Sequence, residues 1–231
     1  MISNGLEIGK RALDAHKYAM DVIGNNIANV NTPGYSRQRV NLEASQPLLI
    51  PVISKGKPLA SLGTGVNVTQ VQRLRDDFLD AQRRDLSESS GTWTQFAQNL
   101  GVIESTFNEP SQTGLSAKLD GYWNAWQSVA SPDPSSSGAR GTLVSQGQLL
   151  ANSLRSTRQS LADLQDNNDK DIVAKVQRIN DIADQIATYN GQIIATKAAG
   201  DANDLLDKRN LLVGELSGLI NFEYYTDTLG G

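Results

Sequence analysis

The side chains that could carry out chemistry are few, and they lack the partners that catalytic or metal sites need. His16 is the only histidine in 231 residues, and the chain has no cysteine. Catalytic triads and zinc sites each require several such groups at defined spacing. We therefore predict a packing or surface role for His16, and we expect no catalytic residue, no cofactor and no metal.

Two short stretches resemble ligand-binding loops but miss residues on which those loops depend. Residues 166–171 read "DNNDKD", yet Asp171 stands where a calcium loop needs glycine, and Gln177 stands where it needs a bidentate glutamate. Residues 62–66 read "LGTGV", without the lysine or following helix of a phosphate loop. We interpret the first as a solvated helix face and the second as a turn into a strand.

Charge and hydropathy exclude two classes of partner. The chain carries 21 basic and 25 acidic residues with a net charge of −4, and the basic residues form no stripe of the kind that binds nucleic acid. Asp207 and Arg209, in "LDKRN", are interpreted as ordinary helix surface charge. No segment approaches about 18 consecutive apolar residues, and the first 30 residues lack a secretory signal pattern, so no membrane span is predicted.

The N-terminal segment carries large apolar residues that alternate at spacings of three and four, which is a heptad seam. Gly9 and His16 are its imperfect members. A helix of this kind is marginal in water without a partner, so we expect it to be mobile alone and stable only beside a second heptad helix. The expected assembly seam consists of Ile2, Leu6, Leu13, Met20, Ile23, Ile27 and Val30.

This helix runs into a dense cluster of turn formers, "NNIANVNTPGYSR", at residues 25–37. Proline disfavours the helical region for the residue before it, glycine tolerates positive φ, and asparagine accepts left-handed conformations. The helix should therefore stop abruptly here. The expected exit turn consists of Asn29, Asn31, Pro33, Gly34, Tyr35 and Arg37.

The pattern beyond the turn predicts a mainly α fold. Alternation around Val40 and Val66 predicts two strands joined by a long irregular excursion, because prolines and glycines interrupt the sequence between them. Helical spacing then covers residues 71–107, 115–129, 142–197 and 205–220, and residues 221–227 are predicted to form a strand. We expect a long helical bundle or coiled coil with a small β-strand excursion after the N-terminal helix, the two longest helices packing antiparallel. We expect four parts: the N-terminal coiled-coil segment with its exit turn at residues 1–36, the β-rich excursion at 37–72, the long-helix bundle at 73–220, and the start of a truncated β-rich domain at 221–231.

The stretch "NNIANVNTPGYSRQRV", preceded by "GLEIGKRALDAHKYAMDVIG", resembles the N-terminal signature of flagellar rod, hook and hook-associated proteins. The stretches "GVNVTQVQRLRDDFLDAQRR" and "NDLLDKRNLLVGELSGLI" narrow the resemblance to hook-associated members at the junction between hook and filament. The resemblance implies that the seam is one strand of an axial coiled coil, and that Tyr35 and Arg37 anchor the exit from it. Relatives are longer and end in a second heptad helix, so we expect an N-terminal fragment.

This family resemblance implies a structural junction role in the bacterial flagellum and no enzymatic activity. The implied partners are the hook protein, a second hook–filament junction protein, other copies of the chain in a ring and an export chaperone, but neither nucleic acid nor membrane. The implied location is the extracellular flagellum, reached through the flagellar type III apparatus. The alternatives are another hook or rod axial protein and a generic coiled-coil scaffold that self-associates without the hook. A hydrolase would need a convergent acid, base and nucleophile, which the sequence does not offer.

Overall fold

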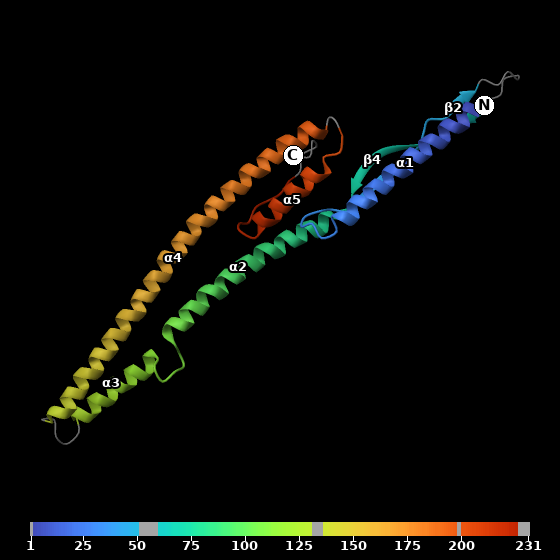
Figure 1. Cartoon of the computed structure of the whole chain (residues 1–231). Helices are drawn as coiled ribbons and strands as arrows, with labels where there is room; N and C mark the ends of the chain where they lie inside the picture. The colour runs from blue at the N-terminus through green and yellow to red at the C-terminus, as the bar shows by residue number, and fades with distance from the viewer. Residues whose placement is uncertain (1, 51–59, 131–135, 198–199, 226–231) are drawn as a thin grey trace. The chain divides into compact units, whose positions relative to one another are not determined.

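The computed structural model describes residues 2–50, 60–130, 136–197 and 200–225, and Figure 1 traces them along the chain. It confirms a mainly α fold with a small β excursion after the N-terminal helix. The chain divides into two compact units, one made of Met1–Glu88 with Asn180–Gly231 and the other of Ser89–Ile179. The elements are α1 (Ile2–Ala28), β1 (Gln38–Ala44), β2 (Leu48–Ile50), β3 (Ala60–Leu62), β4 (Val66–Arg73), α2 (Asp77–Phe107), α3 (Leu115–Ala130), α4 (Ser137–Lys197) and α5 (Asn203–Ser217).

The excursion contains more regular structure than the sequence indicates. The predicted strands form β1 and β4, which pair antiparallel with Val40 opposite Val71. The excursion between them was expected to be irregular, but β2 and β3 also pair antiparallel, with Leu48 opposite Leu62. The prediction was wrong for these residues because three-residue strands give too short an alternation to stand out among prolines. Residues 51–59 of the excursion lie outside the described residues.

Helix α1 packs on the antiparallel pair of β1 and β4, which we call the hairpin, through a stripe of mostly small side chains. Ala15 is buried, and Ile8, Ala19 and Val22 are half-buried along the same line at spacings of three and four or their sum. These positions form one helix face, and small side chains on it let the strands approach closely. The expectation that this segment has no partner within the chain is therefore corrected: its small-residue face has one, in β1 and β4.

Helix α2 begins later than its apolar spacing predicts. Val71 lies in β4 and Leu74 lies between the strand and the helix, whose first residue is Asp77. Asp76 caps the helix, because its Oδ1 accepts the backbone N–H groups of Phe78 at 3.0 Å and Leu79 at 3.2 Å. A side-chain cap of this kind outweighs hydrophobic spacing in setting a helix start.

Helix α4 is a continuous 61-residue helix, as the absence of proline predicts. In the second unit Lys175 Nζ donates to Gln95 Oε1 of α2 at 2.6 Å, and a small cavity is lined by Phe107 of α2 and Thr157 of α4. From Gln95 to Phe107 the chain advances along α2, while the neighbouring residues on α4 go back from Lys175 to Thr157. The two helices therefore run antiparallel in this unit, as expected. Lys118 of α3 similarly contacts Ser153 of α4.

The rest of the first unit contains α5 and the C-terminal end of α4. Ile182 and Ile193 of α4 are fully buried, and Val213 of α5 is almost fully buried. The predicted strand at residues 221–227 is not observed in its described part, where residues 221–225 are irregular, and the remainder lies outside the described residues. Instead, the ring of Tyr224 lies 4.9 Å from the guanidinium carbon of Arg84. A strand needs a partner strand, and none pairs with this segment in the described chain.

The structure also places the stretches that could have carried chemistry. His16 is exposed on α1, residues 166–171 lie within α4, and residues 63–65 turn into β4 as predicted. Among the described residues, no group of three or more acidic or histidine side chains could hold a metal ion. None of the described helices combines the length and the apolar content needed to cross a membrane.

Candidate assembly site

The large apolar side chains of the predicted seam lie on the exposed side of α1. Their exposed fractions run from 55% to 77%, for Leu6, Leu13, Met20, Ile23 and Ile27 of α1 and for Val30, which follows α1 in the turn. Ile2 belongs to α1, but its side chain lies outside the described residues. Full burial of such a side chain contributes roughly 1.5–3 kcal/mol. The seam is therefore a surface that another helix could cover, and the chain's own hairpin leaves it open.

The exit turn follows the end of α1 and is held by short-range polar contacts. Asn29 Nδ2 donates to the carbonyl oxygen of Asn25 at 3.0 Å, and Thr32 Oγ1 donates to Asn29 Oδ1 at 3.1 Å. Gly34 has φ of +82°. A side chain there would be strained and would also lie 3.2 Å from Leu211 Cβ on α5. Glycine therefore allows the turn to pass close to α5.

The remaining predicted turn residues differ in their contacts. The hydroxyl of Tyr35 donates to Asn26 Oδ1 at 2.9 Å. Burial raises the pKa of Tyr35, and the carboxylates of Asp204 and Asp207 add to the shift. The side chain of Arg37 is exposed, and its carbonyl oxygen accepts the N–H of Leu74 at 2.8 Å. Asn31 and Pro33 are exposed as well.

Asn26, which the sequence prediction did not select, connects α1 to the start of β1. Its Nδ2 donates to the Gln38 carbonyl at 2.8 Å, and its Oδ1 accepts the Gln38 N–H at 2.8 Å. The side-chain amide thus makes the same paired bonds with Gln38 that a neighbouring strand would make. Its position on the inward stripe of α1, one turn after Val22, was the available signal.

Asp207 on α5 holds the exit turn from the other side. Its Oδ2 accepts the Ser36 N–H at 2.8 Å, and its Oδ1 accepts the Ser36 hydroxyl at 2.6 Å and Arg73 Nη1 at 2.8 Å. The sequence prediction of a surface charge is wrong here, because Asp207 is only 5% exposed and Arg209 only 4%. Arg209 Nη1 donates to Asn190 Oδ1 of α4 at 3.1 Å. Buried charges of this kind require partners.

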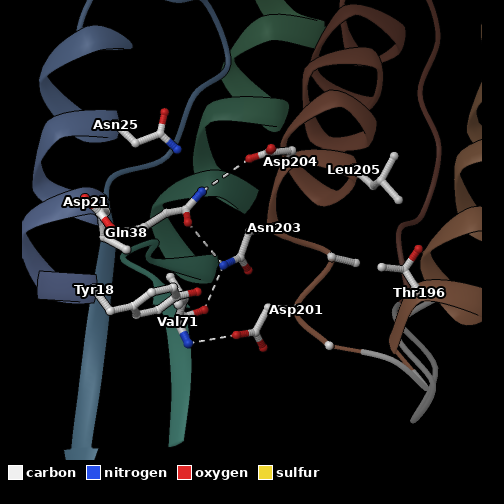
Figure 2. A pocket seen from close by; sticks show the side chains of 13 residues that line it. Tyr18, Asp21, Asn25, Gln38, Val71, Thr196, Asp201, Asn203, Asp204 and Leu205 are labelled. Carbon is white, nitrogen blue, oxygen red and sulfur yellow. Dashed lines mark hydrogen bonds between the residues drawn. The ribbon is translucent and has the colours of Figure 1, made fainter. Parts of the chain in front are cut away.

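A cavity of about 650 Å³ lies beside this contact, between α1, the hairpin and the segment that leads into α5 (Figure 2). On the hairpin side, Asn203 Nδ2 donates to the Val71 carbonyl at 2.7 Å, and Val71 N–H donates to Asp201 Oδ2 at 2.7 Å. Gln38 Nε2 donates to Asp204 Oδ1 at 3.3 Å. Figure 2 shows these bonds opposite Tyr18, Asp21 and Asn25 of α1.

These contacts divide the first unit into two parts with a common boundary. We call α1, the exit turn, β1 and β4 the arm, and we call the bonds from residues 201–207 to the arm the joint. The joint consists of side-chain hydrogen bonds to Ser36, Gln38, Val71 and Arg73. Its chemistry is that of directed hydrogen bonds, which fix an orientation.

Two family models match the chain. The model described as the flagellar hook-associated protein FlgK helical domain matches residues 100–231, and the model described as the flagella basal body rod protein matches residues 6–35. The second match covers most of α1 and the exit turn, which are the parts that carry the seam and the turn formers.

Similar proteins of known name include flagellar hook-associated protein 1 of Bacillus subtilis, which is 34% identical over 98% of this chain and 45% of its own length. The protein of that name from Salmonella typhimurium is 33% identical over 91% of this chain and 37% of its own length. A flagellar hook protein, FlgE of Treponema pallidum, is 44% identical over 27% of this chain and 13% of its own length. The chain thus spans less than half the length of these relatives.

Proposed function

Because this chain belongs to the flagellar hook-associated protein FlgK family, we propose that it is a structural subunit of the junction between hook and filament. The observation that carries this proposal is the exposed heptad seam of α1, backed by its own hairpin and followed by an abrupt exit turn. A helix presented in this way can join a helical assembly, while the turn directs the rest of the chain out of it.

The proposed mechanism is geometric. The seam of α1 enters the packed axial core, and the joint holds the remainder of the first unit in a defined direction outside it. Hook protein subunits lie on one side and a second junction protein on the other, with further copies of this chain beside it in a ring. Covering Leu6, Leu13, Met20 and Ile27 would contribute roughly 1.5–3 kcal/mol for each side chain, which offsets the cost of fixing the helix in the assembly.

The subunit must also be exported from the cell before it can assemble. The subunit reaches the extracellular flagellum through the flagellar type III apparatus, accompanied by an export chaperone. We propose no catalytic activity, because the role needs only binding and orientation. The names of the relatives, which place them with the hook, support this assignment.

The runner-up is a generic coiled-coil scaffold, favoured by the same exposed seam. The two candidates differ in what the seam recognises, since a scaffold would pair with its own copies whether or not a hook is present. Sedimentation of the purified protein over a range of concentrations separates them. A stable oligomer in dilute solution that never binds isolated hooks would favour the scaffold.

Deleting the gene in the source bacterium tests the proposed function. Electron microscopy should show cells that keep their hooks but lack attached filaments, and the filament protein should appear in the medium. Restoring the full-length gene should restore the filaments. Cells that retain normally attached filaments after the deletion would contradict the proposal.

A further inference from the structure

The joint is held by directed side-chain hydrogen bonds. Its hydrogen bonds come from Asp201, Asn203, Asp204 and Asp207, all within one short segment of the chain. Val71 is the one buried apolar side chain on the hairpin side among the described residues of the arm's strands. Apolar contacts tolerate sliding, whereas hydrogen bonds weaken steeply when their angles change. A joint of this composition sets a direction.

Asp207 is central to this joint because one carboxylate reaches two separate elements. Ser36 of the exit turn supplies two donors to it and Arg73 at the end of β4 supplies a third. Arg75 adds two further contacts beside Asp207. Its Nη1 donates to the Ser36 hydroxyl at 3.1 Å, and its Nη2 pairs with Asp80 of α2 at 2.6 Å. The start of α2 and the start of α5 are therefore both connected to the exit turn through Ser36.

From this geometry we propose that Asp207 is a positioning residue, which sets the direction in which the arm leaves the rest of the first unit. The inference deepens the proposed function and rests on it only for its biological consequence, the presentation of the seam at the correct angle. Within the arm, α1 is held on β1 by Asn26, so the arm moves as one piece. Loss of Asp207 frees the arm to swing while its own packing persists.

The substitution Asp207→Asn tests this with almost no change in shape. Both carboxylate oxygens accept N–H or O–H donors, so replacing either oxygen by an NH₂ group sets donor against donor. Glu215→Gln is the matched control, because Glu215 lies on the same helix, is exposed and makes none of the bonds that form the joint. Ser36→Ala is a second variant, which removes one hydroxyl from the exit turn and leaves α5 unchanged.

The chain contains no cysteine, so nitroxide labels can be placed at chosen sites of the purified protein. The distance between labels at Lys10 on α1 and Gln82 on α2 reports the direction of the arm. The distance between labels at Lys208 on α5 and Gln82 reports the packing of the rest of the unit. We expect single narrow distance distributions in the unmodified protein and in Glu215→Gln. Asp207→Asn should lose the narrow arm distance and keep the narrow distance from Lys208, with an intermediate broadening in Ser36→Ala.

Amide hydrogen exchange gives an independent readout. The Ser36 N–H should exchange roughly 10- to 100-fold faster in Asp207→Asn, which corresponds to the usual contribution of a hydrogen bond to a charged group. A narrow arm distance in Asp207→Asn would overturn the proposal, and so would equal broadening of both distances, because Asp207 would then be a general stability residue. Neither result bears on whether the protein acts at the hook–filament junction, so the two proposals fail separately.

Discussion

Gly34 shows how a single residue allows the exit turn to pass close to α5. Its φ of +82° is in the left-handed region, and Leu211 of α5 leaves little room for a side chain. The sequence predicts a turn here from Pro33, Gly34 and the asparagines, because turn chemistry is local, and α1 ends at Ala28. Asp207 was missed for the opposite reason: what buries it is Ser36, 171 residues away, and no local pattern carries that information.

Replacing Gly34 by alanine should destabilise the first unit by about 1–2 kcal/mol, from left-handed strain, with a further cost where Cβ meets Leu211. Gly9→Ala is the matched control, since a Cβ at Gly9 meets nothing within 4 Å, and alanine there should stabilise helix α1 by up to about 1 kcal/mol. Denaturant unfolding of both variants measures the difference. Equal effects from the two substitutions would contradict the role given to Gly34.

Tyr35 gives the unit a dependence on alkaline pH. Its pKa is raised above 10.0, chiefly by burial, so the folded state favours the neutral phenol. The stabilisation is fully present below pH 10 and is lost as pH rises through the raised pKa, because the unfolded chain releases its proton first. Tyr35→Phe should lower stability at neutral pH and remove this part of the alkaline decline.

Denaturant midpoints measured from pH 8 upward check this expectation, with Tyr18→Phe as the control for general effects of removing a phenol. Other tyrosines and lysines also ionise in this range, so the comparison between variants matters more than the decline itself. If Tyr35→Phe declined as steeply as the unmodified protein, the environment assigned to Tyr35 would be wrong.

At the scale of elements, α1 carries two stripes with different partners. Its small residues pack on β1 and β4, and its large apolar residues remain exposed. The heptad spacing predicted the helix, since periodicity depends only on the helix itself, and the use of the seam in assembly stays a prediction. The spacing could not predict that alanines and an asparagine on the opposite face would pack on the chain's own hairpin, because small residues give a weak hydropathy signal.

The two stripes respond differently to the same change in the isolated protein. Ala15→Asp places an unpaired carboxylate against the hairpin and should cost roughly 1–3 kcal/mol. Leu13→Asp changes a side chain that is 70% exposed and should alter stability by less than about 0.5 kcal/mol. Thermal or denaturant unfolding gives both values. A larger loss from Leu13→Asp would mean that the seam is already covered within the chain.

At the scale of the whole molecule, many large apolar side chains of the described residues remain exposed. Helix α2, like α1, exposes large apolar residues, and no residue of α2 is buried. Its exposed apolar residues seven apart are Leu79, Leu86, Trp93, Leu100 and Phe107. Among the described residues, the fully buried large side chains are Ile182 and Ile193. We expect these exposed side chains to contact other helices, which agrees with the proposed role of an assembled subunit.

The central claim is that the seam of α1 attaches the subunit to the hook. The most direct test is the amount of full-length protein retained on hooks isolated from the source bacterium, for cells that produce Leu13→Asp or the control Lys10→Asp. Both introduce a carboxylate at an exposed position of α1, but only the first places it in the seam. We predict that Leu13→Asp is absent from the hooks and that its cells do not swim, while Lys10→Asp is retained. Normal retention and swimming with Leu13→Asp would contradict the account.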